Sequence, residues 1–336
     1  MNNDLRKQLN SEPLIAIAMA TYNPSKEFLI KQLESLKNQT YKNWFCVIVD
    51  DCSQPESFEE IQKLIQNDNR FKLYQNEKNL GAYLTFEQGL LKIPEGTQFI
   101  TFCDQDDVWL PNKLEILSKK LIDNPKAYLV HSDLETINEN DKTIQKSCWD
   151  FEKRSVDKIR TEFLILRNLV TGCSMMFRKE ILNQALPFPS IEEPNNKFIL
   201  HDLWITLCCS VLGPIEFFRE PLVLYRQHSN NVVGSAGRQS PFIKILKAIT
   251  NSGGFKTVNW ILGTGLSMLE SRELLIKFLK ERMPDFKEIS IGKSLLKAFL
   301  NGYHLHTVPI LLFVGFLVDD LCSSAVKERL RREFKL

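Results

Sequence analysis

Apolar runs and stripes of apolar side chains alternate along the first half of the chain. Residues 14–19 form a continuous apolar run, which is typical of a strand buried on both faces. A stripe at helical spacing follows, made of Phe28, Leu29, Leu33 and Leu36. The same order recurs, with strands predicted at 45–49, 71–74 and 99–102 and helices at 57–65 and 83–91. Strands that alternate with helices predict a mostly parallel central sheet flanked by helices.

The alternation loosens after about residue 125. Short apolar segments predict strands or extended chain at 128–130, 172–177 and 215–225, and a helix that starts near His201. The small, polar stretch Ser235–Ser240 is typical of a boundary. We therefore expect an α/β domain over residues 1–234 and a helical C-terminal region over residues 235–336.

The helical C-terminal region is basic. From Pro241 onward the chain holds 15 basic and 9 acidic residues, although the net charge of the whole chain is only +2. A balance so near zero argues against nucleic-acid binding over the whole surface. The basic, amphipathic tail has two interpretations: packed helices with solvated lysines, or peripheral contact with an anionic membrane surface.

Cysteine usage and apolar runs bear on the compartment. The eight cysteines include no CxxC pair, and we expect them to be reduced thiols, as in cytoplasm. The segment Met1–Pro13 is polar and lacks the apolar core of a signal peptide. The run Val308–Val318 is too short to span a bilayer, which takes about 20 residues. We expect a cytoplasmic protein, with contact at the inner face of the membrane left open.

Polar clusters follow three of the predicted strands: residues 21–23, 50–51 and 104–107. Ligands of open α/β sheets bind at the carboxyl ends of strands. Each cluster alone has a structural alternative, in which aspartates cap turns. Three acids within four residues after the strand at 99–102 repel one another, and a hard divalent cation such as Mg²⁺ or Mn²⁺ removes that repulsion. The chain has no glycine-rich phosphate loop, so we expect metal to neutralise substrate phosphates.

Eight short motifs occur in order over residues 13–234 and together resemble the inverting family 2 glycosyltransferases, which have a GT-A fold. The motifs are residues 19–23, 38–41, 49–53, 76–81, 103–109, 170–177, 201–204 and 225–228. The sequences Asp-Gln-Asp-Asp-Val-Trp, His-Asp-Leu-Trp and Tyr-Arg-Gln-His within these motifs resemble bacterial rhamnosyltransferases of surface polysaccharide synthesis.

The resemblance implies a role for several acids. Asp104 and Asp106 would form the metal and diphosphate motif, and His228 would contribute to the metal site. Asp202 matches the general base, which takes the proton of the acceptor hydroxyl. The nucleotide pocket would be lined by Thr21, Asn23, Asp51, Gly81 and Asp104.

Alternative interpretations stay open for individual residues. Asp202 precedes a helix pattern and is also a candidate N-cap. Arg226 has two candidate partners, a substrate phosphate or an acidic neighbour. We expect Trp109 in the core, leave Trp204 as either core or sugar-stacking residue, and expect Lys113 on a helix surface.

The predicted function is transfer of a sugar, L-rhamnose from dTDP-L-rhamnose, onto an acceptor hydroxyl by single-displacement inversion. Expected partners are a dTDP- or UDP-sugar donor and a saccharide or lipid-linked acceptor, with Mg²⁺ or Mn²⁺ as cofactor. Two alternatives are a non-catalytic nucleotide-sugar-binding protein and a sugar-phosphate nucleotidyltransferase. The second usually carries a glycine- and arginine-rich loop near the first strand, which the chain lacks.

Overall fold

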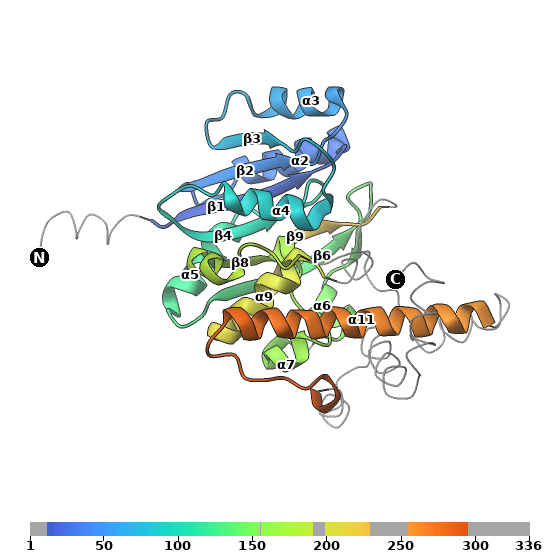
Figure 1. Cartoon of the computed structure of the whole chain (residues 1–336). Helices are drawn as coiled ribbons and strands as arrows, with labels where there is room; N and C mark the ends of the chain where they lie inside the picture. Colours follow the sequence, from blue (N-terminus) through green and yellow to red (C-terminus); the bar gives the residue numbers. More distant parts are fainter. Residues whose placement is uncertain (1–11, 155, 191–198, 229–254, 295–336) are drawn as a thin grey trace, which may run out of the picture. The chain divides into compact units, whose positions relative to one another are not determined.

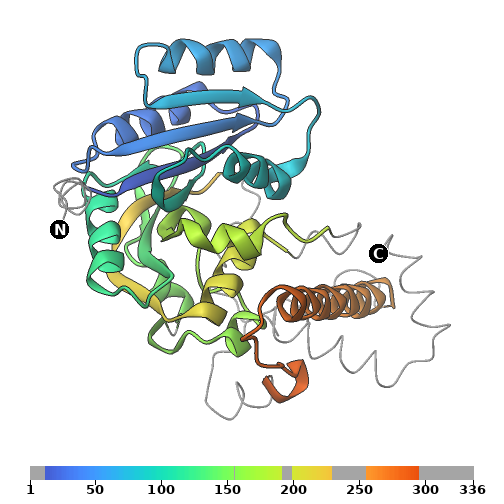
Figure 2. The same ribbon diagram turned by 60° about the vertical axis from the view of Figure 1, so that its left-hand side comes forward.

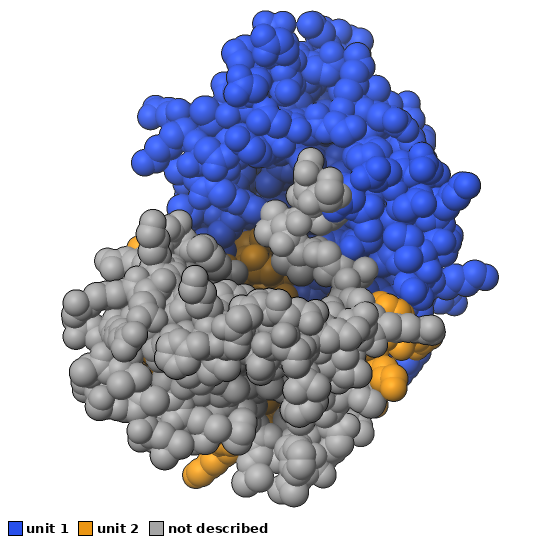
Figure 3. Space-filling view, turned by 90° about the vertical axis from the view of Figure 1, so that its right-hand side faces the viewer, with its two compact units in different colours: residues 1–148, 170–183, 213–234 blue, residues 149–169, 184–212, 235–336 orange. Residues whose placement is uncertain are grey.

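The computed structural model describes residues 12–154, 156–190, 199–228 and 255–294. The chain divides into two compact units, coloured in Figure 3. Unit 1 contains the described residues of 1–148, 170–183 and 213–234, and unit 2 those of 149–169, 184–212 and 235–336. Each unit is described by itself below.

Unit 1 is built on a single mixed sheet, whose described strands lie in the order β3-β2-β1-β4-β8-β6-β9-β5 (Figure 1). Figure 2 shows the blue strands β1 to β3 side by side. The first four strands of this order are parallel, as the strand–helix alternation predicts. They are β1 (Leu14–Thr21), β2 (Trp44–Asp50), β3 (Phe71–Gln75) and β4 (Thr97–Cys103).

The other half of the sheet contains antiparallel pairs. Strand β8 runs antiparallel to both β4 and β6, β9 runs parallel to β6, and β5 runs antiparallel to β9. The sheet is therefore mixed: the first four strands of this order are parallel to one another, as expected, and β9 is parallel to β6, while the remaining pairs are antiparallel. The bounds are β5 (Val108–Trp109), β6 (Leu129–Ile137), β7 (Thr143–Gln145, which pairs with β6), β8 (Met175–Arg178) and β9 (Ile215–Arg226).

Helices cover both faces of the sheet, and α2 and α4 lie on opposite faces (Figure 1). The side chains of Ile15 and Ile17 on β1 share a core with α2, α3 and α5. On the other face Gly89 of α4 lies against Ala18, where an added Cβ would come within 3.6 Å of the Ala18 Cβ. The bounds are α2 (Lys26–Lys37), α3 (Pro55–Ile65), α4 (Gly81–Leu91) and α5 (Lys113–Asp123).

The described part of unit 2 is helical. Trp204 of α9 is fully buried and donates its indole N–H to the carbonyl of Ala185 at 2.9 Å, so it is a core residue. No helix in the described ranges is long and apolar enough to cross a membrane. The short helices at or near the unit boundaries are α6 (Cys148–Glu152), η1 (Val156–Lys158), α7 (Thr161–Leu164), η2 (Gly172–Ser174), η3 (Lys179–Ile181) and α8 (Leu182–Ala185), and the longer ones are α9 (His201–Leu212) and α11 (Phe255–Arg282).

Helix α11 agrees with the expectation of helices beyond residue 235. The predicted boundary Ser235–Ser240 and the apolar run Val308–Val318 lie outside the described residues. The basic tail is described only in part, so its membrane interpretation stays a prediction.

Candidate active site

An acidic loop, residues 104–107, leaves the carboxyl end of β4. Asp107 is fully buried, and its Oδ1 accepts the backbone N–H of Arg226 at 3.0 Å. Its Oδ2 has no hydrogen-bond partner among the described residues. Burial, and then the charges of Asp106 and Asp104, raise the pKa of Asp107 well above its usual range. The loop therefore brings three carboxyl groups together, and the buried Oδ2 of Asp107 is a ligand atom that accepts no hydrogen bond from the described residues.

Asp104, Asp107 and Cys173 each offer one ligand atom, and these atoms lie within 4.8 Å of one another. Two carboxylates with an unsatisfied buried oxygen fit a divalent cation, which prefers oxygen ligands. Burial raises the pKa of the Cys173 thiol, so the sulfur is protonated unless a metal displaces the proton. The sequence does not single out Cys173, because a lone cysteine has no metal-ligand spacing.

Asp106 faces His228, which comes two residues after β9. The His228 Nε2 lies 2.8 Å from the Asp106 Oδ2, and the imidazole stacks on Phe28 with ring centroids 5.7 Å apart. Two of the three predicted metal ligands therefore lie in direct contact, and the third, Asp104, lies beside Asp107. Their role in metal binding stays a prediction.

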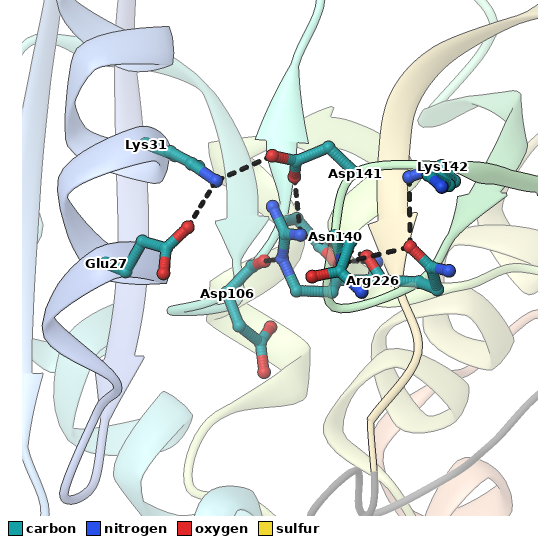
Figure 4. Close-up of polar contacts among 9 residues, drawn as sticks. Glu27, Lys31, Asp106, Asn140, Asp141, Lys142 and Arg226 are labelled. Atoms are coloured by element: carbon teal, nitrogen blue, oxygen red, sulfur yellow. Dashed lines mark hydrogen bonds and ion pairs between the residues drawn. The ribbon is translucent and has the colours of Figure 1, made fainter.

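Arg226 is fully buried at the end of β9 and holds the acidic loop. Its Nε donates to the backbone carbonyl of Asp106 at 2.8 Å, and its Nη1 lies 2.6 Å from the Asp141 Oδ1 (Figure 4). Of the two partners that the sequence left open, the structure therefore pairs Arg226 with the acidic neighbour.

The expectation that Lys113 lies on a helix surface is wrong. Lys113 is fully buried at the first position of α5, and its Nζ donates to the carbonyl of Cys173 at 2.7 Å. Its ammonium lies over the Trp109 ring, which is itself a core residue as expected. Desolvation lowers the pKa of Lys113 to about 7. The spacing contained a signal for this burial, since Lys113 precedes Leu117 and Leu121 at four-residue intervals on the buried stripe of α5.

Asp51 organises the loop that enters α4. Its Oδ1 accepts the Asn76 side-chain amide and the Leu80 backbone N–H, both at 2.8 Å, and its Oδ2 accepts the Gly81 N–H at 2.8 Å. Gly81 has a φ of +78°, a conformation that favours glycine. A carboxylate accepts about four hydrogen bonds, so Asp51 keeps capacity for one further donor.

Thr21 and Asn23 connect the ends of β1 and β2. The Thr21 hydroxyl donates to the buried Asp50 carboxylate at 3.0 Å. Asn23, at a φ of +40°, accepts the Gln54 N–H with its Oδ1 at 2.9 Å. The structure therefore places Thr21, Asn23 and Asp51 along neighbouring strand ends, as predicted, while their contact with a nucleotide stays a prediction.

Asp202 belongs to unit 2, in the first turn of α9. It is almost fully buried, and its Oδ1 accepts the Leu203 N–H at 2.6 Å. Because α9 begins at His201, Asp202 lies inside the helix rather than at its N-cap position.

Ser174 of η2 donates its hydroxyl to the Thr171 carbonyl at 2.8 Å.

Comparison with sequence families gives one matching family model. The model described as "Glycosyl transferase family 2" matches residues 16–184. This range contains the acidic loop and the ends of β1, β2 and β4.

A curated relative that the chain matches is named by its reaction. It is the UDP-Glc:alpha-D-GlcNAc-diphosphoundecaprenol beta-1,3-glucosyltransferase WfgD of Escherichia coli. The chain is 28% identical to it over 194 residues, which cover 58% of this chain and 69% of the relative.

Two solved structures share the fold. The first is S. aureus TarS 1–349 in complex with UDP-GlcNAc, with a TM-score of 0.52 and 16% identity over 91% of each chain. The second is the mannosyltransferase PcManGT of Pyrobaculum calidifontis in complex with GDP-Man and Mn²⁺, with a TM-score of 0.51 and 14% identity over 93% of this chain and 88% of that chain. At these identities the likeness shows the fold alone, and it confirms the expected GT-A-like α/β architecture.

Proposed function

Because the chain belongs to glycosyltransferase family 2, we propose that it transfers a sugar from a nucleoside diphosphate donor to an acceptor hydroxyl in cell-surface polysaccharide synthesis. The observation that carries this proposal is the acidic loop at the carboxyl end of β4. There Asp106 faces His228, and Asp107 keeps an unsatisfied buried oxygen. A divalent cation bound together with a diphosphate supplies the positive charge that these carboxylates attract, and it also offsets the negative charge of the diphosphate.

The cofactor we propose is Mg²⁺ or Mn²⁺, held by Asp104, Asp106 and His228. The carboxylate oxygens of Asp104 and Asp106 support it, as does the Mn²⁺ in the complex of PcManGT, which shares the fold. The ligand atoms that lie within 4.8 Å of one another are those of Asp104, Asp107 and Cys173. When bound, such an ion offsets the negative charge that builds on the leaving diphosphate.

The strand ends of unit 1 would hold the nucleotide. The carboxylate of Asp51 only accepts hydrogen bonds and has room for one more donor. The imide N–H of uracil or thymine is a donor of the kind it can accept. Thr21, Asn23 and Gly81 would shape the pocket around it. Holding the base at one end fixes the diphosphate against the acidic loop.

Asp202 is the proposed general base. The acceptor oxygen attacks the anomeric carbon, the bond from that carbon to the diphosphate oxygen breaks, and the anomeric configuration inverts in this single step. Asp202 takes the acceptor proton as the new bond forms. Its burial and its motif support this role.

The donor we propose to test first is dTDP-L-rhamnose. Its support is the residue pattern of the motifs at 104–109, 201–204 and 225–228. The compared proteins are named with UDP-Glc, UDP-GlcNAc and GDP-Man instead. The name of WfgD supports a saccharide on a lipid diphosphate as the acceptor class.

The test is nucleotide release from a panel of dTDP-, UDP- and GDP-sugars, with Mn²⁺, with Mg²⁺ and with chelator. We expect release from one donor that requires the ion and that falls by about 10²-fold or more in Asp106→Asn, as for loss of a charge-stabilising group. The matched control is Asp123→Asn, which removes an exposed aspartate on α5. Full activity of Asp106→Asn would overturn the metal assignment, and absence of nucleotide binding across the panel would overturn the proposed function.

Asp202→Asn tests the base. We expect kcat to fall by about 10²–10⁴-fold, because proton transfer by a positioned group contributes that much. Binding of the donor nucleotide, measured by calorimetry, should stay near the wild-type value. A variant that keeps its kcat would show that another group takes the proton.

Peripheral contact of the basic tail with the cytoplasmic face of the membrane is the remaining part of the proposal. The excess of basic residues after Pro241 supports it. The full-length chain should sediment with anionic vesicles at low salt and be released at high salt. A chain that stays in the supernatant at low salt contradicts it.

A further inference from the structure

Arg226 joins the acidic loop to a turn between two strands. Its Nε donates to the Asp106 carbonyl at 2.8 Å, while its Nη1 donates to the Asn138 carbonyl at 3.1 Å and to the Asp141 Oδ1 at 2.6 Å. Its own backbone N–H meets the Asp107 carboxylate at 3.0 Å. Through one residue the conformation of the acidic loop therefore depends on the β6–β7 turn.

A fully buried guanidinium needs a counter-charge, because its desolvation is costly. Asp141 supplies that charge, although its own side chain is 43% exposed. The turn holds Asp141 at a φ of +58°, and Asn138 fixes this turn by accepting the N–H groups of Asn140 and Lys142 with its Oδ1. Figure 4 shows the Asp141 carboxylate between Arg226 and Lys31.

Helix α2 completes the arrangement. Lys31 lies 2.6 Å from Asp141 and 2.7 Å from Glu27, and its hydrogen bond, followed by that of Arg226, holds the pKa of Asp141 below its usual range. One turn earlier on the helix, the Phe28 ring packs under the Arg226 guanidinium, with 4.4 Å from Cζ to the ring centroid.

Phe28 and Arg226 also contact two of the proposed metal ligands, His228 and Asp106. His228 stacks on Phe28, and its Nε2 meets the Asp106 carboxylate. Arg226 therefore fixes the Asp106 backbone, while His228, two residues further along, faces the Asp106 side chain. A shift of Arg226 changes both contacts together.

We propose that Arg226 is a positioning residue for the metal-binding carboxylates, and that the ion pair of Asp141 with Lys31 and Arg226 sets its position. The proposal rests on the metal role in the proposed function. It makes a half-exposed aspartate outside the acidic loop a determinant of metal affinity. A purely structural ion pair would change the stability of the fold and leave the affinity of the folded protein for metal unchanged.

The test measures free Mn²⁺ by electron paramagnetic resonance during titration of the full-length chain with nucleoside diphosphate present. In Asp141→Asn the Mn²⁺ affinity should fall by about 10–100-fold, as for partners that orient metal ligands. Arg226→Lys should also lower the Mn²⁺ affinity, because lysine keeps the positive charge but loses the planar, multi-donor geometry of the guanidinium. At saturating Mn²⁺ the Asp141→Asn enzyme should regain most of its kcat.

The matched control is Asp68→Asn, at the other end of the sheet. Asp68 pairs with Arg70, whose guanidinium lies 4.0 Å from the Trp44 ring centroid, so the control breaks an aspartate–arginine–aromatic set without touching the acidic loop. Its Mn²⁺ affinity should equal that of the wild type. Unchanged affinity in folded Asp141→Asn, or an equal loss in Asp68→Asn, overturns the inference alone. A wild-type chain that binds no Mn²⁺ overturns the proposed metal role and the inference with it.

Discussion

Lys113 and Asp107 are both fully buried near the acidic loop, and burial moves their pKa values in opposite directions. The pKa of Lys113 falls to about 7, and that of Asp107 rises well above its usual range. Both shifts favour the neutral form, because the interior solvates charge poorly. The folded chain therefore holds a lysine that releases its proton near neutral pH.

Lys113 makes the stability of unit 1 depend on pH. In the unfolded chain its pKa returns to the ordinary 10.5, so between about pH 7 and pH 10 the unfolded state holds a proton that the folded state has lost. The stability contributed by this residue thus rises with pH in that window. It is lost progressively as the pH falls from about 10, and it is absent below about pH 7. Relative to Lys113→Met, the wild-type free energy of unfolding should rise by about 2 kcal/mol between pH 7 and pH 9.

Urea unfolding at the two pH values measures this difference. Lys119→Met is the matched control, since Lys119 lies on the same helix with its side chain 73% exposed. Its difference from the wild type should not change with pH. If the difference in the free energy of unfolding between wild type and Lys113→Met is also independent of pH, Lys113 has an ordinary pKa in the folded chain.

The sequence indicates some of these residues and not others. The pairing of Asp106 with His228 follows motifs that already suggested a shared site. Cys173 lies within the motif 170–177, but nothing in the sequence indicated a metal role for it, because its approach to Asp104 depends on where β8 enters the sheet. Residue types and spacing therefore predict which side chains do chemistry better than they predict which buried groups surround them.

At the scale of elements, α4 begins without a side-chain cap from its own N-cap residue, Leu80. The carboxylate of Asp51, at the end of β2, instead accepts the N–H groups of Leu80 and Gly81. The negative charge also lies where the helix dipole is positive. A strand end thus supplies the cap of a helix that starts 30 residues later in the chain.

Asp51→Asn should loosen this loop. The amide keeps one acceptor oxygen and directs an NH₂ group at donors that need an acceptor, so the free energy of unfolding should fall by about 1–3 kcal/mol. Hydrogen exchange at the Leu80 and Gly81 amides should become faster, and nucleotide affinity should fall. Glu56→Gln, an exposed acid in the first turn of α3, is the control. Unchanged exchange at the two amides would contradict the capping role of Asp51.

The sequence predicts the first four strands well because all four alternate with helices, and β1, β2 and β4 are buried on both faces. Strands β8 and β9 were expected as extended segments, but their neighbours were not. β8 pairs with β4 and β6, and β9 pairs with β6 and β5. These pairings join segments far apart in the chain, and local periodicity holds no information on them.

At the scale of the whole molecule, the two units are interleaved in sequence. Residues 149–169 and the described part of 184–212 belong to unit 2 together with 255–294. The predicted division at residues 234 and 235 lies outside the described residues and stays a prediction. A shift in composition marks one boundary along the sequence. It does not indicate that a compact unit is built from several separate stretches of the chain. The function class was predictable nevertheless, because five of the eight motifs (19–23, 49–53, 76–81, 103–109 and 225–228) lie at the carboxyl ends of strands of unit 1.

The contacts of Arg226 and His228 with the acidic loop also set an order for biosynthesis. They join residues separated by 119 to 122 positions in the chain. A ribosome-bound chain that ends before β9 can pair its first four strands, yet it exposes the acidic loop without its guanidinium and imidazole partners. The proposed site is therefore completed only after β9 has been synthesised, and chains terminated before β9 would carry the proposed nucleotide-binding edge without Arg226 and His228.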